Sequence, residues 1–226
     1  MAGGLEGNER GTGRTPSVDG RLARGMRTRR SVAEALVGLL EDGVTEPTAR
    51  QVAEAAGVSL RLVFHHFADM EDLYREICQL QLERYWSDLP RIPADLPLEQ
   101  RVGRLVDDRS TRFEQVSAIR RAGIRRADRS PVVASIIEQS NRLLRRQLEA
   151  TFGPELAGPH RQGDELLEAL DGATSWAIWE QLRRHQALSA PATCRVMSRT
   201  VTALLETALP FRSDVAARRR SEQDRN

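Results

Sequence analysis

Apolar side chains recur at helical spacing from Met26 onward. The first stripe follows the i, i+3, i+4, i+7 and i+8 spacing of an amphipathic helix. It comprises Val32, Ala35, Leu36, Leu39 and Leu40. Gly43 follows this stripe, as a glycine does beyond a helix C-terminus. A strand-type alternation persists nowhere in the sequence, so the pattern predicts an all-α protein of about nine helices.

Two short helices are predicted between residues 48 and 67. Thr48 is a good N-cap for the first of them. The small-residue face of that helix comprises Ala49, Val52, Ala53 and Ala56. Gly57 supplies a left-handed backbone for the turn, and Ser59 caps the next helix, which runs to about Phe67. Because small residues let two helices cross closely, this segment predicts a helix-turn-helix whose second helix lies in the major groove of DNA.

The later part of the chain predicts further helices separated by breaks. Asp69 caps a longer helix, and three prolines in residues 89–97 end the helical pattern. The helices expected beyond this break cover 97–126 (as two helices), Ser130-Pro131 to about Phe152, 164–185 and 190–209.

These elements divide the chain into four expected segments. Residues 1–25 lack apolar periodicity and are expected to form a disordered N-terminal arm. Residues 26–84 are the expected DNA-binding domain, residues 85–211 a larger helical domain, and residues 212–226 a disordered tail. The arm either follows the DNA or has no role, and the second interpretation is favoured because most termini are poorly tied down.

Composition and charge add few constraints. The chain has a formal net charge of +2 and only 4% aromatic residues, which permits nucleic-acid binding without requiring it. All of its basic residues are arginines, whose planar fork suits phosphate or guanine. The sequence contains no apolar run long enough to cross a bilayer, and its start does not read as a secretory signal. Cys78 and Cys194 have no partner at metal-ligand spacing, so we expect reduced thiols, a cytoplasmic location and no metal or cofactor.

The segment around the helix-turn-helix carries a more specific signal. It reads TARQVAEAAGVSLRLVFHHFADMEDLYREI. Its distinctive positions are Thr48, the Ala-Gly-Val-Ser turn at 56–59, Phe64, His66, Phe67, Glu71 and Leu73. In these positions the chain resembles the TetR/AcrR family of helix-turn-helix transcriptional regulators. The resemblance covers about residues 27–76 without gaps, and farther along only helix number and length fit the family.

The resemblance implies an Ω-shaped homodimer of a bacterial repressor. Such a protein binds palindromic operator DNA, and an unidentified small molecule bound in residues 85–211 releases it. The DNA contacts carried over by position are Thr48, Arg50, Ser59, Leu60, Arg61, His65 and His66. Arg61 is the leading candidate for base contact, because a guanidinium that engages O6 and N7 of guanine contributes about 1–3 kcal/mol of discrimination. Val58, Val63 and Phe67 are expected in the core.

Three positions depart from the family's pattern. Leu62 replaces a common hydroxyl, Phe64 the usual Tyr, and Met70 a frequent Lys. Each change removes a backbone contact, so DNA affinity would depend more on Arg29 and Arg30 as well as Arg50 and the arm. Residues 26–67 contain five Arg and five Asp or Glu, so the predicted DNA-binding region has no net basic charge.

Two sets of residues are candidates for function in the C-terminal half. Apolar stripes on the last two helices either pair with a second copy, as the resemblance implies, or are buried within one chain. They comprise Leu166, Leu170, Ala173, Ala177, Met197, Val201, Leu204 and Leu205. The second set lines a ligand pocket or is ordinary core packing. It comprises Trp86, Arg109, Phe113, Trp176 and Trp179.

Two other classes of function are weighed against the regulator. An enzyme is disfavoured because the sequence has no glycine-rich phosphate loop, nucleophile elbow or metal-ligand spacing. A chromosome-organising protein without sequence preference would have a more basic surface than a net charge of +2 indicates. The arginines at 120, 121, 125 and 126 either attract an acidic ligand or a lipid or form a solvated helix face, and the solvated face is the commoner arrangement.

Overall fold

The computed structural model describes residues 18–157 and 160–208. Over these ranges it contains α-helices and one π-helical turn but no strand, which confirms the all-α prediction. The elements are α1 (Val18–Glu41), α2 (Ala49–Ala55), α3 (Leu60–His66), α4 (Met70–Tyr85), α5 (Leu98–Ala127), α6 (Pro131–Leu156), α7 (His160–Ala173), α8 (Trp176–Glu180), η1 (Gln181–His185) and α9 (Ala190–Ala208). Residues 1–17 and 209–226, with most of the expected arm and all of the tail, lie outside the described ranges.

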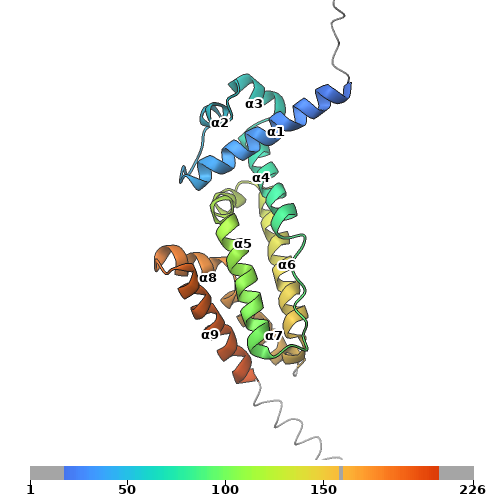
Figure 1. Cartoon of the computed structure of the whole chain (residues 1–226), viewed down its shortest axis with the longest axis vertical. Coiled ribbons are helices and arrows are strands. Elements are labelled where there is room, and N and C mark those ends of the chain that lie inside the picture. The colour runs from blue at the N-terminus through green and yellow to red at the C-terminus, as the bar shows by residue number, and fades with distance from the viewer. Residues whose placement is uncertain (1–17, 158–159, 209–226) are drawn as a thin grey trace, which may run out of the picture.

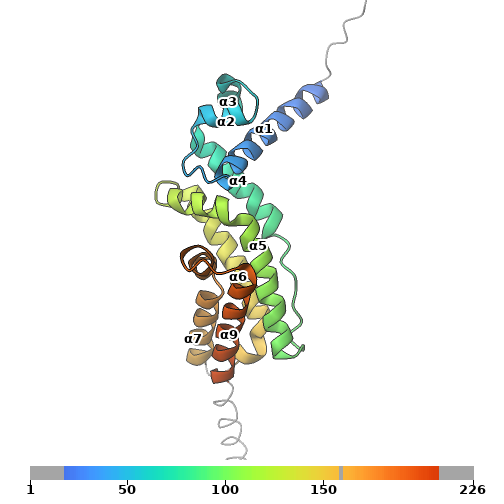
Figure 2. The same cartoon turned by 60° about the vertical axis from the view of Figure 1, so that its left-hand side comes forward.

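The helices form an elongated molecule with two unequal ends. Helices α1, α2 and α3 lie at one end, and α5, α6, α7 and α9 make a bundle at the other (Figure 1). Helix α4 leads from the small end into the bundle, which is also clear in the rotated view of Figure 2. The short helices α2 and α3 therefore stand far from the C-terminal end of the chain.

Side-chain caps define where several helices begin. Thr48 and Gln51 form a capping box at α2, in which the Thr48 side chain accepts a hydrogen bond from the backbone of Gln51. Ser59, Asp69 and Ser130 cap α3, α4 and α6 in the same way. The predicted caps are thus confirmed, because each hydroxyl or carboxylate satisfies a backbone N–H that has no intrahelical acceptor.

Three predicted helix boundaries are corrected by the structure. Helix α1 begins at Val18, eight residues before the expected boundary at 26. Helix α5 is a single helix of 30 residues where two were expected, since no proline interrupts residues 98–127. The helix expected over 164–185 is broken between α7 and α8, where Ser175 caps the new helix and Arg109 donates to the carbonyl oxygen of Thr174 at 2.7 Å.

Two apolar cores share helix α4. The first joins the small end to the C-terminal part of α5, and its members include Val32, Leu36, Val52, Val63, Phe67, Leu73, Ile77, Ile119 and Val133. The second fills the bundle, and its members include Leu82, Trp86, Leu105, Phe113, Leu148, Phe152, Leu170, Trp179, Val201 and Leu205. Because α4 contributes Leu73 and Ile77 to one core and Leu82 to the other, a shift of α4 must disturb both.

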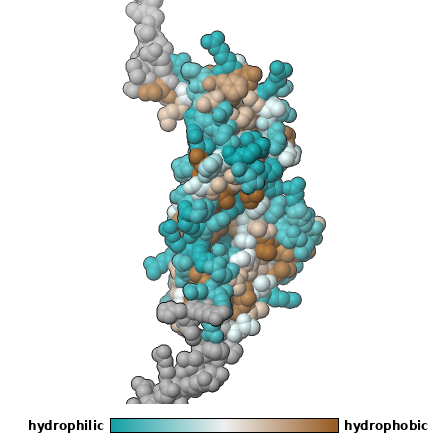
Figure 3. All heavy atoms as spheres, turned by 180° about the vertical axis from the view of Figure 1, so that it is seen from behind, coloured by the Kyte–Doolittle hydropathy of each residue, from teal (hydrophilic) through white to brown (hydrophobic). Residues whose placement is uncertain are grey.

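The surface is mostly hydrophilic. Figure 3 shows scattered hydrophobic patches among polar side chains on the face seen from behind. The large apolar side chains exposed over the described residues are Leu22, Met26, Leu60, Phe64, Leu80, Ile124, Val132, Ile178 and Val196. None of the helices described has the length and apolar character required to span a membrane.

Candidate nucleic-acid interface

The turn between α2 and α3 sets the position of α3. Gly57 has a φ of +64°, in the left-handed region where a side chain would be strained, and this reverses the chain within a few residues. Ser59 then accepts from the backbone N–H of Leu62 and starts α3. Val63, on the inner face of α3, is buried in the first core. Phe67, directly after the end of α3, is buried there too, and each of the two side chains is only 1% exposed. Val63 and Phe67 thus confirm the core expected at these positions, while Val58 is half-buried.

The outer face of α3 presents side chains that the fold does not use. Leu60, Arg61 and His65 are exposed. Within the described part of the chain, Arg61 has no hydrogen-bond or ion-pair partner. The ring of His65 lies 5.2 Å from the ring of His66, measured between centroids. A helix with this free face and a packed inner face has the form needed to enter a DNA groove.

Phe64 belongs to the same outer face and was not among the expected contacts. It is 48% exposed, unlike most large aromatic side chains of the protein. Its spacing of three residues from Arg61 places both side chains on one side of α3. That spacing was readable in the sequence, but an aromatic residue in a helix is more often buried.

The residues at the start of α2 are also exposed. Thr48 is committed to the capping box, since its hydroxyl also donates to Oε1 of Gln51 at 2.9 Å. Arg50 is exposed and has no ion-pair partner among the described residues. Arg50 and Arg61 are therefore the two expected DNA contacts that present an unneutralised guanidinium.

Arg29 lies between helices instead of projecting freely. Its Nε and Nη2 donate to the carboxylate of Glu76 at 3.2 and 2.6 Å, and its Nη1 donates to the carbonyl oxygen of His66 at 2.6 Å. The guanidinium is also 4.3 Å from the centre of the Phe67 ring. Arg29 was expected to offer a free charge to DNA phosphates. Instead, its N–H donors are used in hydrogen bonds that connect α1 to α3 and α4.

Arg30 and His66 offer less free positive charge to a DNA phosphate than their positions in the sequence suggested. Arg30 is exposed but pairs with Glu34 one turn along α1, at 2.8 Å. Burial, the neighbouring His65 and the charge of Arg29 lower the pKa of His66. A neutral imidazole can still donate one hydrogen bond to a phosphate, but it contributes no positive charge.

The comparisons with known proteins agree with this geometry. Residues 33–77 match the family model described as bacterial regulatory proteins of the tetR family. The helix-turn-helix segment of the chain is therefore similar to the DNA-binding region of these regulators. No curated protein matches the sequence.

Solved structures resemble the whole TetR-type fold. A TetR-family transcriptional regulator from Streptomyces coelicolor is 16% identical with a TM-score of 0.60, over 88% of this chain and 98% of that one. A transcriptional regulator from Rhodococcus sp. Rha1 is 19% identical with a TM-score of 0.59, over 79% and 96%. A putative TetR-family regulator from Mesorhizobium loti is 17% identical with a TM-score of 0.52, over 81% and 98%. At these identities the likeness concerns the fold.

Arginines near the end of α5 connect the TetR-type helix-turn-helix region to the bundle. Arg125 donates to the carbonyl oxygen of Thr45, in the α1–α2 loop, at 2.8 Å. Arg126 lies 3.4 Å from the carboxylate of Glu71 and 3.6 Å from the centre of the Tyr74 ring, both on α4. The loop that precedes α2 is therefore tied directly to α5.

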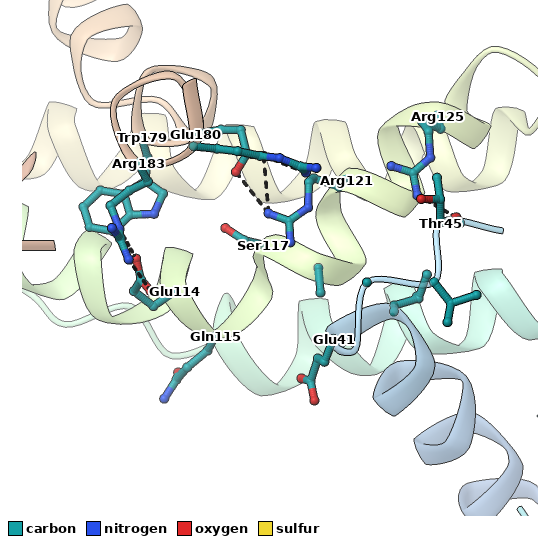
Figure 4. Close-up of a pocket in the computed structure, with 15 residues that line it drawn as sticks. Glu41, Thr45, Glu114, Gln115, Ser117, Arg121, Arg125, Trp179, Glu180 and Arg183 are labelled. Atoms are coloured by element: carbon teal, nitrogen blue, oxygen red, sulfur yellow. Dashed lines mark hydrogen bonds and ion pairs between the residues drawn. The ribbon is translucent and has the colours of Figure 1, made fainter. Parts of the chain in front are cut away.

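A polar cleft lies at this junction. Figure 4 shows it between the α1–α2 loop, α5 and the α8–η1 segment. Its volume is about 510 Å³. Two ion pairs cross the cleft, Arg121 with Glu180 at 3.1 Å and Arg183 with Glu114 at 2.6 Å (Figure 4). These pairs connect α5 to α8 and η1.

The expected pocket residues are brought together inside the bundle. The rings of Trp86, Phe113 and Trp179 follow one another at 6.1 Å between neighbouring centroids. Arg109 is fully buried and donates to the carbonyl oxygens of Thr174 and Leu144 at 2.7 and 2.9 Å. Trp176 is buried and donates from Nε1 to the hydroxyl of Ser117 at 3.0 Å. In this state all five side chains pack in the interior.

Half of the expected interface residues are corrected to core positions. Leu170, Met197, Val201 and Leu205 are at most 1% exposed within a single protomer, so they cannot present a surface to a second copy. The remaining four positions are less buried, with Leu166, Ala173 and Leu204 half-buried and Ala177 exposed. Ile178 and Val196, which the stripes did not include, are about two-fifths exposed on the same helices.

Proposed function

We propose that this chain is a TetR-family repressor that binds palindromic operator DNA as a homodimer. The observation that carries the proposal is the outer face of α3, where Arg61 and His65 are exposed and free of the ion pairs that occupy Arg29 and Arg30. In this proposal Arg61 reads guanine, and Arg50 contacts the DNA backbone at the start of α2. Residues 26–84 act as the DNA-binding domain.

Residues 85–211 act in this proposal as the ligand-sensing and dimerisation domain. The second copy packs on the exposed side of α8 and α9, where Ala177, Ile178 and Val196 lie. A small molecule bound in the bundle favours a conformation in which the two α3 helices are wrongly spaced for adjacent grooves, so ligand and DNA weaken each other's binding. The chain acts by reversible binding without turnover, and in the cytoplasm.

Selection of DNA from a random library by the purified chain tests this proposal. We expect enrichment of an inverted repeat whose half-sites lie about one helical turn or a multiple apart, because two α3 helices related by a two-fold axis read them. Light scattering of the protein alone measures the dimer independently. A library that shows no enrichment, or enrichment of a single half-site by a monomer, would contradict the proposal.

A further inference from the structure

Arg120, on α5, carries a charge where four helices meet. Its Nη1 donates to the hydroxyl of Ser140 at 2.8 Å, and its Nη2 donates to Oδ1 of Asn141, both on α6. The guanidinium lies 5.7 Å from the centre of the Trp176 ring on α8. Cys78, on α4, lines the same site. Arg120 therefore lies beside side chains of α4, α6 and α8.

No acidic side chain neutralises Arg120 in the part of the chain that the structure describes. Its hydrogen bonds go only to the neutral side chains of Ser140 and Asn141. Its Nε is buried and finds no hydrogen-bond acceptor. Cys78 does not act as the counterion, since burial raises the pKa of its thiol to about 12. Burial lowers the pKa of Arg120 to about 10, which leaves the guanidinium charged near neutral pH.

Two arginines of the bundle, Arg101 and Arg109, are more deeply buried than the half-buried Arg120, and both have structural partners. Arg101 pairs with Glu155 at 2.6 Å. Arg109 has no paired carboxylate but holds two backbone carbonyl oxygens, which fixes the break between α7 and α8. Arg120 lacks both kinds of partner. Because Arg120 is only half-buried but has no acidic partner among the described residues, a bound anion could reach its guanidinium and stabilise its charge.

The cleft beside Arg120 has mostly apolar walls. It is lined by Leu82 and Trp86 of α4, Val116 and Ile119 of α5, and Ile136 and Ile137 of α6. Its volume is about 30 Å³, so it is narrow. Apolar walls around one unneutralised cation complement a molecule with an anionic head and an apolar tail.

We propose that this cleft binds a small carboxylic acid with a short apolar tail, its carboxylate on Arg120. The inference rests on the proposed ligand-responsive function and names the chemical class of the ligand. A guanidinium recognises a carboxylate through paired N–H donors, and the free Nε of Arg120 supplies one of them. The tail extends between Leu82 and Ile136, from α4 to α6.

The size of the cleft links ligand binding to DNA binding. Because the cleft is narrow, we expect α4 to move away from α5 and α6 when the ligand enters. Helix α4 begins at Met70, four residues after α3 ends at His66. The movement is therefore passed directly to the recognition helix, and DNA affinity falls as the ligand binds.

Tryptophan fluorescence of the full chain, without DNA, tests the site directly. Trp86 lines the cleft and Trp176 lies beside Arg120, so a bound molecule changes the emission of both. We expect a saturable response to hexanoate, and at least about tenfold weaker binding of the neutral hexanamide and of acetate, which lacks the tail. Arg120→Gln weakens hexanoate binding by at least about the same factor. Arg104→Gln, an exposed charge change on the same helix, leaves it unchanged.

The outcomes separate this inference from the function on which it rests. Equal binding of hexanoate and hexanamide, no saturable response up to the solubility limit, or unchanged binding by Arg120→Gln would overturn the anion site. If Arg120→Gln fails to fold, the comparison of hexanoate with hexanamide on the unmodified chain still tests whether the site binds an anion. Selection of a palindromic operator by a chain that binds no hexanoate would contradict the anion site alone. Hexanoate binding by a chain that selects no DNA would support the site and contradict the proposed function.

Discussion

At the α2–α3 end of the molecule Arg61 projects from α3 without a partner, whereas at the far end of the bundle Arg101 is buried and paired. Arg101 donates to Glu155 and to the carbonyl oxygen of Thr151, and its side chain is 6% exposed. Both residues are arginines, so the difference comes from their surroundings. The short helix α3 packs with one face only and leaves Arg61 in water, whereas the long helices α5 and α6 pack together and enclose Arg101.

The two ends also differ in how they hold their helices. The helix-turn-helix region uses short helices set by side-chain caps at Thr48, Ser59 and Asp69. The bundle uses long helices joined by buried polar contacts such as those of Arg109 with Thr174 and Leu144. Substitutions at the first end should therefore change recognition with small losses of stability, and substitutions at the second should reduce stability directly.

The largest effect is expected for Arg101→Ala. Removing the guanidinium leaves Glu155, whose side chain is 9% exposed, as an unpaired buried charge. The free energy of unfolding should fall by about 3–5 kcal/mol, measured by urea denaturation. The control is the double variant Arg101→Ala/Glu155→Ala, which removes the unpaired charge and should cost less than the sum of the two single changes. An unchanged denaturation midpoint for Arg101→Ala would show that the pair contributes nothing.

Arg61→Ala tests the opposite end. It should weaken binding to the selected operator by about 1–3 kcal/mol, about tenfold to a hundredfold, and relax base preference. The melting temperature should not change, since Arg61 has no partner among the described residues. Arg29→Ala is the matched variant, because its loss of the Glu76 and His66 contacts should lower the melting temperature. Equal weakening of operator and random DNA by Arg61→Ala would argue against base reading.

The local signals of the sequence were sufficient for the small end of the fold. Caps and spacing located α2, α3 and the start of α4 because these depend on residues within a few positions of one another. The break at Thr174 was not predictable from local sequence, since it is held by Arg109, 65 residues away. The burial of Leu170 and Val201 within one protomer could not be predicted from the sequence either. An apolar stripe has the same residue pattern whether it packs on a helix of its own chain or on a helix of a second copy.

Ser59→Ala measures how much the cap contributes to the stability of α3. Loss of the bond from the Leu62 N–H to the Ser59 hydroxyl should lower the free energy of unfolding by about 1 kcal/mol, measured by thermal denaturation. Ser135→Ala is the control, since Ser135 is exposed inside α6 and caps no helix. Equal effects of the two changes would mean that α3 is held by its core contacts alone.

The smallest effect is expected for Phe64→Tyr, which restores the hydroxyl that the family usually carries. Phe64 is 48% exposed, so the added oxygen meets solvent in the free protein and the melting temperature should stay the same. On operator DNA the hydroxyl gains a phosphate contact, worth about 0.5 kcal/mol at an exposed site, so affinity should rise about twofold in a fluorescence-anisotropy titration. Phe64→Leu keeps an apolar side chain without the oxygen and should bring no gain. If both variants bind DNA alike, Phe64 does not face the phosphates, and the outer face of α3 is turned differently on the duplex than Arg61 requires.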